Sequence, residues 1–201
     1  DPLHWGHLLA ALQAMADQKL DKIVFCISGK NPEKPTQEKT QILRHAMAQA
    51  VLGKVFSPLF EYSPLQFDRE IDGETAVFEY LEQHKDLPMK VYYLVGGDHY
   101  REKNAQGGPD TLPNLETKGA DPKKLGVIFF ERGEKGPEVP TALDVKFQPP
   151  VPFDASSTDI REKGRLFLMP FAAYEFLINH NREAIHDRYG IEDKATRPKL
   201  I

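Results

Sequence analysis

Two histidines stand three positions apart near the start of the sequence, in the stretch His4-Trp5-Gly6-His7. Side chains at positions i and i+3 lie on one face of a helical turn, so both imidazoles could reach one ligand. Gly6 has no Cβ and leaves room for a phosphate or a base. A helix start also offers unpaired N–H groups and the positive end of the dipole, so the pattern indicates an anion site. Surface histidines and a metal site are the alternatives, although no cysteine or third histidine lies nearby to complete a metal set.

A second polar motif, Ser156-Ser157-Thr158-Asp159-Ile160-Arg161, follows about 150 residues later. Its hydroxyls and N–H groups at an expected helix start suit phosphate oxygens, and Arg161 adds a cation with planar donors one turn on. The alternative is a simple helix N-cap. Together, in this order, the two motifs point to an enzyme that handles a nucleoside triphosphate.

Gly96-Gly97-Asp98 directly follows an apolar stretch that reads as a strand over Lys90–Val95. Ligands of open parallel sheets bind outside the carboxyl ends of the strands, which is where this turn would lie. The two glycines would let a nucleotide approach the backbone closely. An ordinary turn is the alternative.

Apolar periodicity and turn residues define the elements that would position these motifs. Between Arg101 and Pro122 the composition predicts a loop with at most about one turn of helix. Helices are expected over 6–18, 36–52, 74–84, 157–163, 170–180 and 182–189, and strands over 21–28, 55–59, 90–95, 127–131 and 143–147.

This alternation of strands and helices predicts an α/β fold, with a Rossmann-like, mostly parallel sheet covered by helices on both faces. A phosphate-binding strand–loop–helix unit needs a strand before its loop, and the sequence begins at Asp1, immediately before the histidines. We therefore expect a first strand missing before Asp1. The length of 201 residues predicts a single domain over 1–201, truncated at its N-terminus.

Composition narrows the class of protein. Charged residues make up 28% and the net charge is −4, which argues against a broad nucleic-acid-binding surface. The single cysteine, Cys26, excludes an intrachain disulfide, and its apolar neighbours predict a buried thiol. No apolar stretch reaches the length of a membrane span and no secretory signal is visible, so we expect a cytoplasmic protein without a membrane partner. A monomer and a homo-oligomer are both left open.

With these three motifs, the chain resembles the nucleotidyltransferase superfamily that carries the histidine-x-glycine-histidine signature, and most of all its bacterial nicotinate (or nicotinamide) mononucleotide adenylyltransferases. The resemblance covers essentially the whole sequence except the family's first strand. It implies that a mononucleotide phosphate attacks the α-phosphorus of ATP, and that pyrophosphate leaves with Mg²⁺. Such a transfer depends on positioning and charge neutralisation more than on a covalent nucleophile.

The resemblance also implies residue roles. His7 would stabilise charge on the α-phosphate, His4 would contact the triphosphate beside it, and Arg161 completes the expected catalytic set. No metal held by protein side chains is expected, apart from a contribution of Asp98 to the ion carried by the triphosphate. ATP would be bound by Gly6, Gly96, Gly97, Asp98, Arg132, Ser156, Ser157 and Thr158, and the acceptor by Lys34, Lys39, Arg44, Thr75 and Tyr100.

One feature departs from the family. Its members place a tryptophan shortly after the Gly-x-Asp turn, where it stacks on the pyridine ring, whereas the only tryptophan here is Trp5. Tyr100 could stack instead. Two alternatives stay open: adenylyl or cytidylyl transfer to another acceptor such as phosphopantetheine or an alcohol phosphate, and a noncatalytic nucleotide-binding module. The acid and amide forms of the pyridine base are likewise not distinguished.

Overall fold

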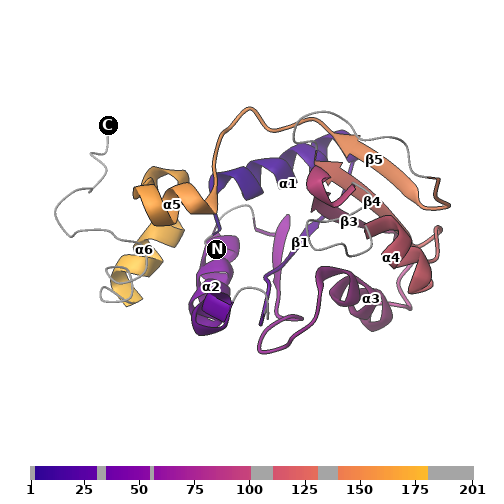
Figure 1. The fold of residues 1–201 in the computed structure, drawn as a ribbon, viewed down its shortest axis with the longest axis horizontal. Coiled ribbons are helices and arrows are strands. Elements are labelled where there is room, and N and C mark those ends of the chain that lie inside the picture. Colours follow the sequence, from indigo (N-terminus) through magenta and orange to yellow (C-terminus); the bar gives the residue numbers. More distant parts are fainter. Residues whose placement is uncertain (1–2, 31–34, 55–56, 101–110, 131–139, 181–201) are drawn as a thin grey trace. The chain divides into compact units, whose positions relative to one another are not determined.

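The computed structural model describes residues 3–30, 35–54, 57–100, 111–130 and 140–180. Figure 1 labels its helices and strands. The contacts within the chain divide it into two compact units. Unit 1 comprises residues 1–71 and 151–201, and unit 2 comprises residues 72–150. The histidine motif and the Ser-Ser-Thr motif therefore belong to unit 1, and the Gly-Gly-Asp motif belongs to unit 2.

Unit 1 is built on two parallel strands. β1 (Ile23–Cys26) pairs with β2 (Phe60–Ser63), with Ile23 opposite Phe60. α2 packs against both β2 and α6. The helices of this unit are α1 (Trp5–Gln18), α2 (Pro35–Lys54), α5 (Ser157–Lys163) and α6 (Phe171–His180), with the short 3₁₀ helix η2 at Leu166–Leu168.

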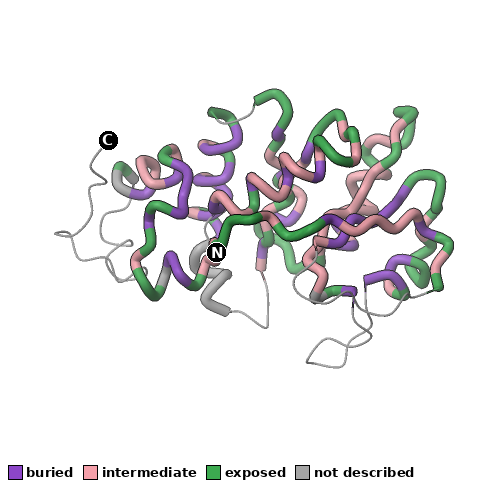
Figure 2. The backbone as a smooth tube through the Cα atoms, turned by 90° about the horizontal axis from the view of Figure 1, so that it is seen from above, coloured by how far each residue is buried: buried purple, intermediate pink, exposed green. Residues whose placement is uncertain are grey.

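α1 packs through one apolar face. Leu8, Ala11 and Ala14 recur every three residues and are buried. Figure 2 colours the described backbone by burial. α1 ends where Lys19 adopts a left-handed conformation, with φ 54°, and its N–H donates to the carbonyl of Met15. The helix that begins at the histidines is therefore anchored by burial of its apolar face.

Unit 2 contains a three-stranded sheet, and all of its pairs are parallel. The order is β3 (Val91–Gly96), β4 (Leu125–Phe130), β5 (Asp144–Gln148), so the middle strand is β4. Parallel strands in this order need crossover connections. The helices of this unit are α3 (Gly73–Gln83), α4 (Thr111–Thr117) and the 3₁₀ helix η1 (Gly97–Tyr100).

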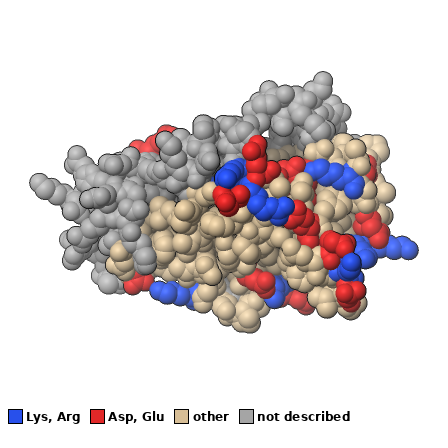
Figure 3. All heavy atoms as spheres, turned by 90° about the horizontal axis from the view of Figure 1, so that it is seen from below, with Lys and Arg blue, Asp and Glu red and all other residues tan. Residues whose placement is uncertain are grey.

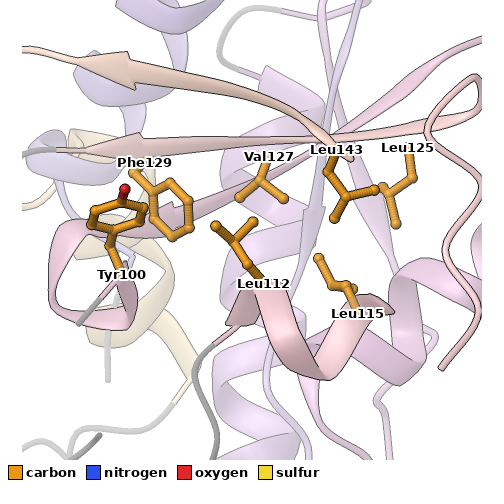
Figure 4. Close-up of a cluster of buried hydrophobic side chains, with 7 residues drawn as sticks. All are labelled: Tyr100, Leu112, Leu115, Leu125, Val127, Phe129 and Leu143. Atoms are coloured by element: carbon orange, nitrogen blue, oxygen red, sulfur yellow. The ribbon is translucent and has the colours of Figure 1, made fainter. Parts of the chain in front are cut away.

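The core of unit 2 forms on one face of this sheet. Leu125, Val127 and Phe129 alternate along β4, as side chains on one face of a strand do, and all three are fully buried. Figure 4 shows them facing Leu112 and Leu115 of α4. Side chains of α3 also pack against this cluster, which fixes α3 and α4 on the same layer: Val77, Phe78 and Leu81.

The predicted α/β class, with parallel strands and helices between them, is confirmed. The strand predicted at 55–59 is wrong: Ser57, Pro58 and Leu59 form a turn and the strand runs over Phe60–Ser63. Proline has no N–H to donate to a ladder, so pairing begins after it. The stretch before Pro122 holds more helix than expected, since α4 is seven residues long. The helix expected over 182–189 lies outside the described residues, while the strand before Asp1 and the single domain stay predictions.

The prediction of a buried thiol is also wrong, because Cys26 is exposed. Burial falls along β1 from Ile23, which is buried, through two half-buried residues to Cys26. The strand has only four residues, and Cys26 is its last, so an apolar run that looks continuous in sequence leaves the sheet at this position.

Candidate active site

The two histidines are in direct contact at the start of α1. His4 is the N-cap in an extended conformation, and its backbone N–H donates to Nδ1 of His7 over 3.4 Å. The imidazole rings stack with centroids 3.8 Å apart and planes inclined by 26°. His4 is buried, with 5% of its surface exposed, whereas His7 is exposed. The expectation that both rings could serve one ligand is thus compatible with their geometry.

The bond from the His4 backbone bears on the protonation of His7. Nδ1 that accepts a hydrogen bond carries no proton, so a neutral His7 ring carries its proton on Nε2. Nε2 is then a donor at the exposed end of the first helical turn, beside the positive end of the dipole. This arrangement favours an anionic oxygen.

Gly6 connects the two distant motifs. A Cβ added to Gly6 would lie 3.0 Å from Nδ1 and Cε1 of His4, and 3.4 Å from Cβ of Ala155. Ala155 immediately precedes Ser156, so the histidine turn and the start of the Ser-Ser-Thr turn lie close together within unit 1. The sequence predicts their convergence, and this contact supplies the geometry for it.

The second motif forms the start of α5. Ser156 is the N-cap, and its Oγ accepts from the N–H of Asp159 over 3.0 Å. The simple capping role is therefore real, yet a serine hydroxyl that accepts one bond still has a proton to donate. Ser157 is half-buried, Thr158 is exposed, and Arg161 stands at the fifth position of α5 with its side chain outside the described part of the structure.

Asp159, in the first turn of α5, forms ion pairs with two cations that follow it in the sequence. Its carboxylate contacts Nζ of Lys163 at 2.6 Å and Nη1 of Arg165 at 3.3 Å. The hydrogen bond from Lys163, above all, lowers the pKa of Asp159, and the charges of Lys163 and Arg165 act in the same direction. Lys163 and Arg165 are thus both paired with Asp159.

The Gly-Gly-Asp turn of unit 2 lies where the sequence predicts it. Gly96 is the last residue of β3, paired with Phe130 of β4, and Gly97 opens η1. The turn is therefore at the carboxyl end of a parallel strand, the usual place for a ligand in such sheets. The side chain of Asp98 lies outside the described residues.

Tyr100, expected to stack on the acceptor base, is instead a core residue. Only 5% of its surface is exposed, and its ring makes edge contacts with Phe129 and Phe147 at centroid distances of 5.0 and 4.9 Å. Figure 4 shows it inside the apolar cluster. This expectation is wrong because η1 turns the tyrosine inward onto the sheet.

Arg44 also has a different role from the one expected. It is 4% exposed, and its two terminal nitrogens donate to the carbonyls of Ser28 (2.8 Å) and Gly29 (3.1 Å). The guanidinium thus holds the backbone that follows β1, so we no longer assign it to the acceptor phosphate. Gly29 is needed there, since a Cβ would lie 1.7 Å from the carbonyl oxygen of Gln66.

The other basic candidates cannot be placed in the same way. Lys34 and Arg132 lie outside the described residues, and Lys39 is on α2 with its side chain likewise outside them. Lys30, which precedes the undescribed residues 31–34, forms an ion pair with Asp68 at 2.9 Å.

Thr75 occupies the third position of α3, as the sequence predicts for a helix start. Asp72 is the N-cap and accepts from the Thr75 N–H over 2.6 Å. The Thr75 hydroxyl accepts from Nζ of Lys118, which follows α4, over 3.3 Å. Sequence reasoning did not identify Asp72, although an aspartate before a helical stretch is a capping signal. Lys118 has no such signal, because it reaches Thr75 only through the fold.

In the described part of the chain, no three His, Cys, Asp or Glu side chains are grouped so as to hold a metal ion. None of the described helices has the length and apolar character needed to cross a bilayer. On the face drawn in Figure 3, basic and acidic side chains are interspersed rather than gathered into a basic area.

Comparison with known proteins gives the family. The sequence pattern of the cytidylyltransferase-like family matches residues 1–163, which span the histidine motif, the Gly-Gly-Asp turn and the Ser-Ser-Thr-x-x-Arg motif. The chain belongs to this family of nucleotidyltransferases. Enzymes of the family generally use a divalent metal ion.

Individual relatives carry names that are more specific than the family description. A protein of Thermoanaerobacter sp. (strain X514) named probable nicotinate-nucleotide adenylyltransferase is 31% identical over 178 residues, covering 81% of this chain and 78% of the relative. Proteins of the same name from Thermus thermophilus and Moorella thermoacetica are each 28% identical, covering 81% and 88% of this chain and 81% and 84% of the relatives.

Proposed function

We propose that this chain transfers AMP from ATP to nicotinate mononucleotide, or its amide, in NAD biosynthesis. A phosphate oxygen of the mononucleotide attacks the α-phosphorus of ATP, the bond from this phosphorus to the bridging oxygen breaks, and pyrophosphate leaves. The observation that supports the proposal is the close approach of Gly6 to Ala155, which brings the turn of the stacked histidines near the Ser-Ser-Thr turn. The names of the relatives support the choice of substrate.

In unit 1, different residues are proposed for the α-phosphate and for the β- and γ-phosphates of ATP. Nε2 of His7 would donate to the α-phosphate as charge builds up there, and His4 would contact the triphosphate beside it. Gly6 keeps the backbone accessible. Ser156, Ser157 and Thr158 would bind the β- and γ-phosphates with hydroxyls and N–H groups, and Arg161 would add a fixed cation.

In unit 2 the proposed contacts are to the nucleosides. Gly96 and Gly97 would admit a nucleotide to the backbone, and Asp98 would accept hydrogen bonds from ribose hydroxyls. Thr75 would contact the acceptor. Arg132 of unit 2, outside the described residues, is proposed for the adenine side. From unit 1, Lys34, also outside the described residues, is proposed for the acceptor phosphate, with Lys39 as the second candidate.

We propose Mg²⁺ as the divalent ion, because hard oxygen ligands such as phosphates suit it. Asp98, in η1 directly after β3, is the carboxylate that would contribute to an ion carried by the triphosphate. When bound, the ion would neutralise phosphate charge. We also propose a cytoplasmic location, where an exposed thiol such as Cys26 stays reduced.

The test is an assay of pyrophosphate release with ATP, Mg²⁺ and a panel of phosphorylated acceptors. We expect turnover with nicotinate or nicotinamide mononucleotide, and the ratio of their kcat/KM values decides between acid and amide. The buried position of Tyr100 leaves the pyridine ring without the expected aromatic partner, so phosphopantetheine and alcohol phosphates belong in the panel. Turnover only with those acceptors would contradict the substrate. ATP binding without any turnover would indicate a noncatalytic module.

A further inference from the structure

A polar cluster at the start of α3 joins α3 to α4 and centres on one lysine. Lys118 is the first residue after α4, and its Nζ lies 3.0 Å from Oδ2 of Asp72 and 3.3 Å from Oε2 of Glu74. Its third contact is the Thr75 hydroxyl, also at 3.3 Å. A single ammonium group therefore uses all of its donors on three polar side chains around the first turn of α3.

The cluster is more than an exposed ion pair. Glu74 is 9% exposed, and its Oε2 also accepts from Nδ2 of Asn114 over 2.7 Å. Burial raises the pKa of Glu74, whereas Lys118 and Asn114 oppose that rise. The charge of Lys118 thus compensates the partly desolvated carboxylate of Glu74, and this pairing holds the Lys118 side chain in one position.

That position determines what the Thr75 hydroxyl can do. An ammonium group only donates, so in its contact with Lys118 the Thr75 oxygen must be the acceptor. The Thr75 N–H is already bound to Asp72. Burial of Asp72 acts to raise its pKa, but the hydrogen bonds from the Thr75 N–H and hydroxyl and from Lys118 outweigh it and lower the pKa. Without substrate, the hydroxyl proton of Thr75 is therefore directed at the Asp72 carboxylate. An incoming molecule can therefore accept a hydrogen bond from the Thr75 hydroxyl only by replacing Asp72 as the partner of this one proton.

We propose that Lys118 is a positioning residue for the acceptor: because it donates to the Thr75 oxygen, it fixes the hydroxyl as a donor, whose proton turns from Asp72 to an oxygen atom of the mononucleotide when the acceptor binds. This inference rests on the proposed function, which assigns Thr75 to the acceptor. Lys118 itself does not touch substrate and acts through Thr75.

The experiment is a double-mutant cycle with Thr75→Val and Lys118→Met, assayed with nicotinate mononucleotide and ATP. Loss of one hydrogen bond predicts a rise of roughly five- to tenfold in the KM for the mononucleotide for either single variant. The KM for ATP should change by less than about twofold, because the triphosphate contacts lie elsewhere in the proposed scheme. In the double variant the KM should equal that of Thr75→Val alone, since Lys118 has no further effect without its hydroxyl.

Lys118→Arg provides a rescue arm, because a guanidinium also only donates and can keep the hydroxyl in the same role. The matched control is Lys85→Met, which breaks the exposed 2.7 Å ion pair with Glu82 in the same unit and should leave both KM values unchanged. Thermal unfolding of each variant separates a loss of stability from a loss of positioning.

Independent effects that multiply in the double variant would overturn the proposal, as would a fall in melting temperature with an unchanged acceptor KM. Failure of the proposed function is a different result, seen in the wild-type chain before any variant. If the wild type uses another acceptor, the cycle is run with that acceptor and the same outcomes apply. Absence of turnover with every acceptor would overturn both proposals.

Discussion

The stacked histidines show how a backbone group can determine side-chain chemistry. The His4 N–H would otherwise be one of the unpaired donors at a helix start, and it binds Nδ1 of His7. The same bond orients the His7 ring and leaves the proton of a neutral ring on Nε2. A residue proposed to meet the α-phosphate is therefore held in one tautomer before ATP binds.

Replacement of His7 by alanine tests this role. We expect kcat to fall by about 10²–10³-fold, the usual cost of removing one transition-state donor, while ATP affinity falls only modestly. Pyrophosphate release gives the first quantity and calorimetric titration with ATP the second. His84→Ala is the control, because that ring stacks on Tyr80 at the end of α3 in unit 2. Wild-type turnover in His7→Ala would show that the mechanistic assignment is wrong.

Gly6→Ala tests the contact between the motifs with a single methyl group. The added Cβ would press on the His4 ring at 3.0 Å, a distance that requires the ring to move, and would touch Ala155 at 3.4 Å. We expect kcat/KM for ATP to fall in Gly6→Ala, and to fall by more than a change in folding stability would explain. The comparison is Gly53→Ala in α2, where nothing lies within 4 Å and alanine should stabilise the helix by up to about 1 kcal/mol. Equal activity of the two variants would remove the case for a tightly packed pair of motifs.

Which residues the sequence identifies depends on whether their partners are local. His4 and His7 interact within one turn, so their contact follows from spacing alone. Arg44 and Tyr100 do not, because the loop after β1 and the face of the unit 2 sheet determine their surroundings. The sequence suggests a ligand-binding role for both, because a cation suits a phosphate and an aromatic ring suits a base. In the fold, Arg44 instead binds backbone carbonyls and Tyr100 packs in the core.

At the scale of elements, α2 places a further histidine where it can respond to pH. His45 is 3% exposed, its Nδ1 lies 2.8 Å from the hydroxyl of Tyr62 on β2, and its ring contacts Phe67. Burial chiefly lowers the pKa of His45, and the neighbouring charge of Arg44 lowers it further, against a hydrogen bond with the Ser28 backbone. The ring is therefore accommodated in its neutral form.

This lowered pKa predicts an acid-sensitive stability. In the unfolded chain histidine titrates near about 6.5, so as the pH falls below that value the unfolded state takes up a proton before the folded state does. The contribution of neutral His45 to the free energy of unfolding should be fully present above about pH 6.5. It should decline as the pH falls toward the pKa of His45 in the folded state. His45→Gln should flatten this decline in unfolding experiments between about pH 7.5 and 5, whereas His84→Gln should not. An unchanged slope in His45→Gln would contradict the assignment to His45.

Most elements could be predicted because their apolar periodicity is local, as in α1 and α3. The errors occur where tertiary context decides: Pro58 delays β2, and the four-residue β1 exposes Cys26 at its end. The sequence underestimates α4 because Pro113 and Asn114 look like loop residues. A proline is tolerated in the first turn of a helix, and Leu112 and Leu115 bury its apolar side.

For the whole molecule, the net charge of −4 means that binding of anionic substrates depends on local donors rather than on an overall attraction. The family match runs through both compact units, so the residues proposed for ATP and for the acceptor belong to one family pattern. Stability of the chain should then depend on its nucleotide.

ATP with Mg²⁺ should raise the free energy of unfolding by about 2.7 kcal/mol at a concentration about one hundred times its Kd. AMP should stabilise much less at the same concentration, because it lacks the β- and γ-phosphates assigned to Ser156–Thr158. Melting curves over a nucleotide titration measure both. Equal stabilisation by AMP and ATP would mean that this turn does not bind the triphosphate tail.

The exposed end of β1 has a practical consequence. Cys26 is the only thiol in the chain, and it stands two and three residues before Ser28 and Gly29, whose carbonyls Arg44 holds. A maleimide dye would therefore attach at one known position, beside the loop that leads to Lys30. Fluorescence from that dye could follow the arrival of each substrate in real time, without an engineered cysteine.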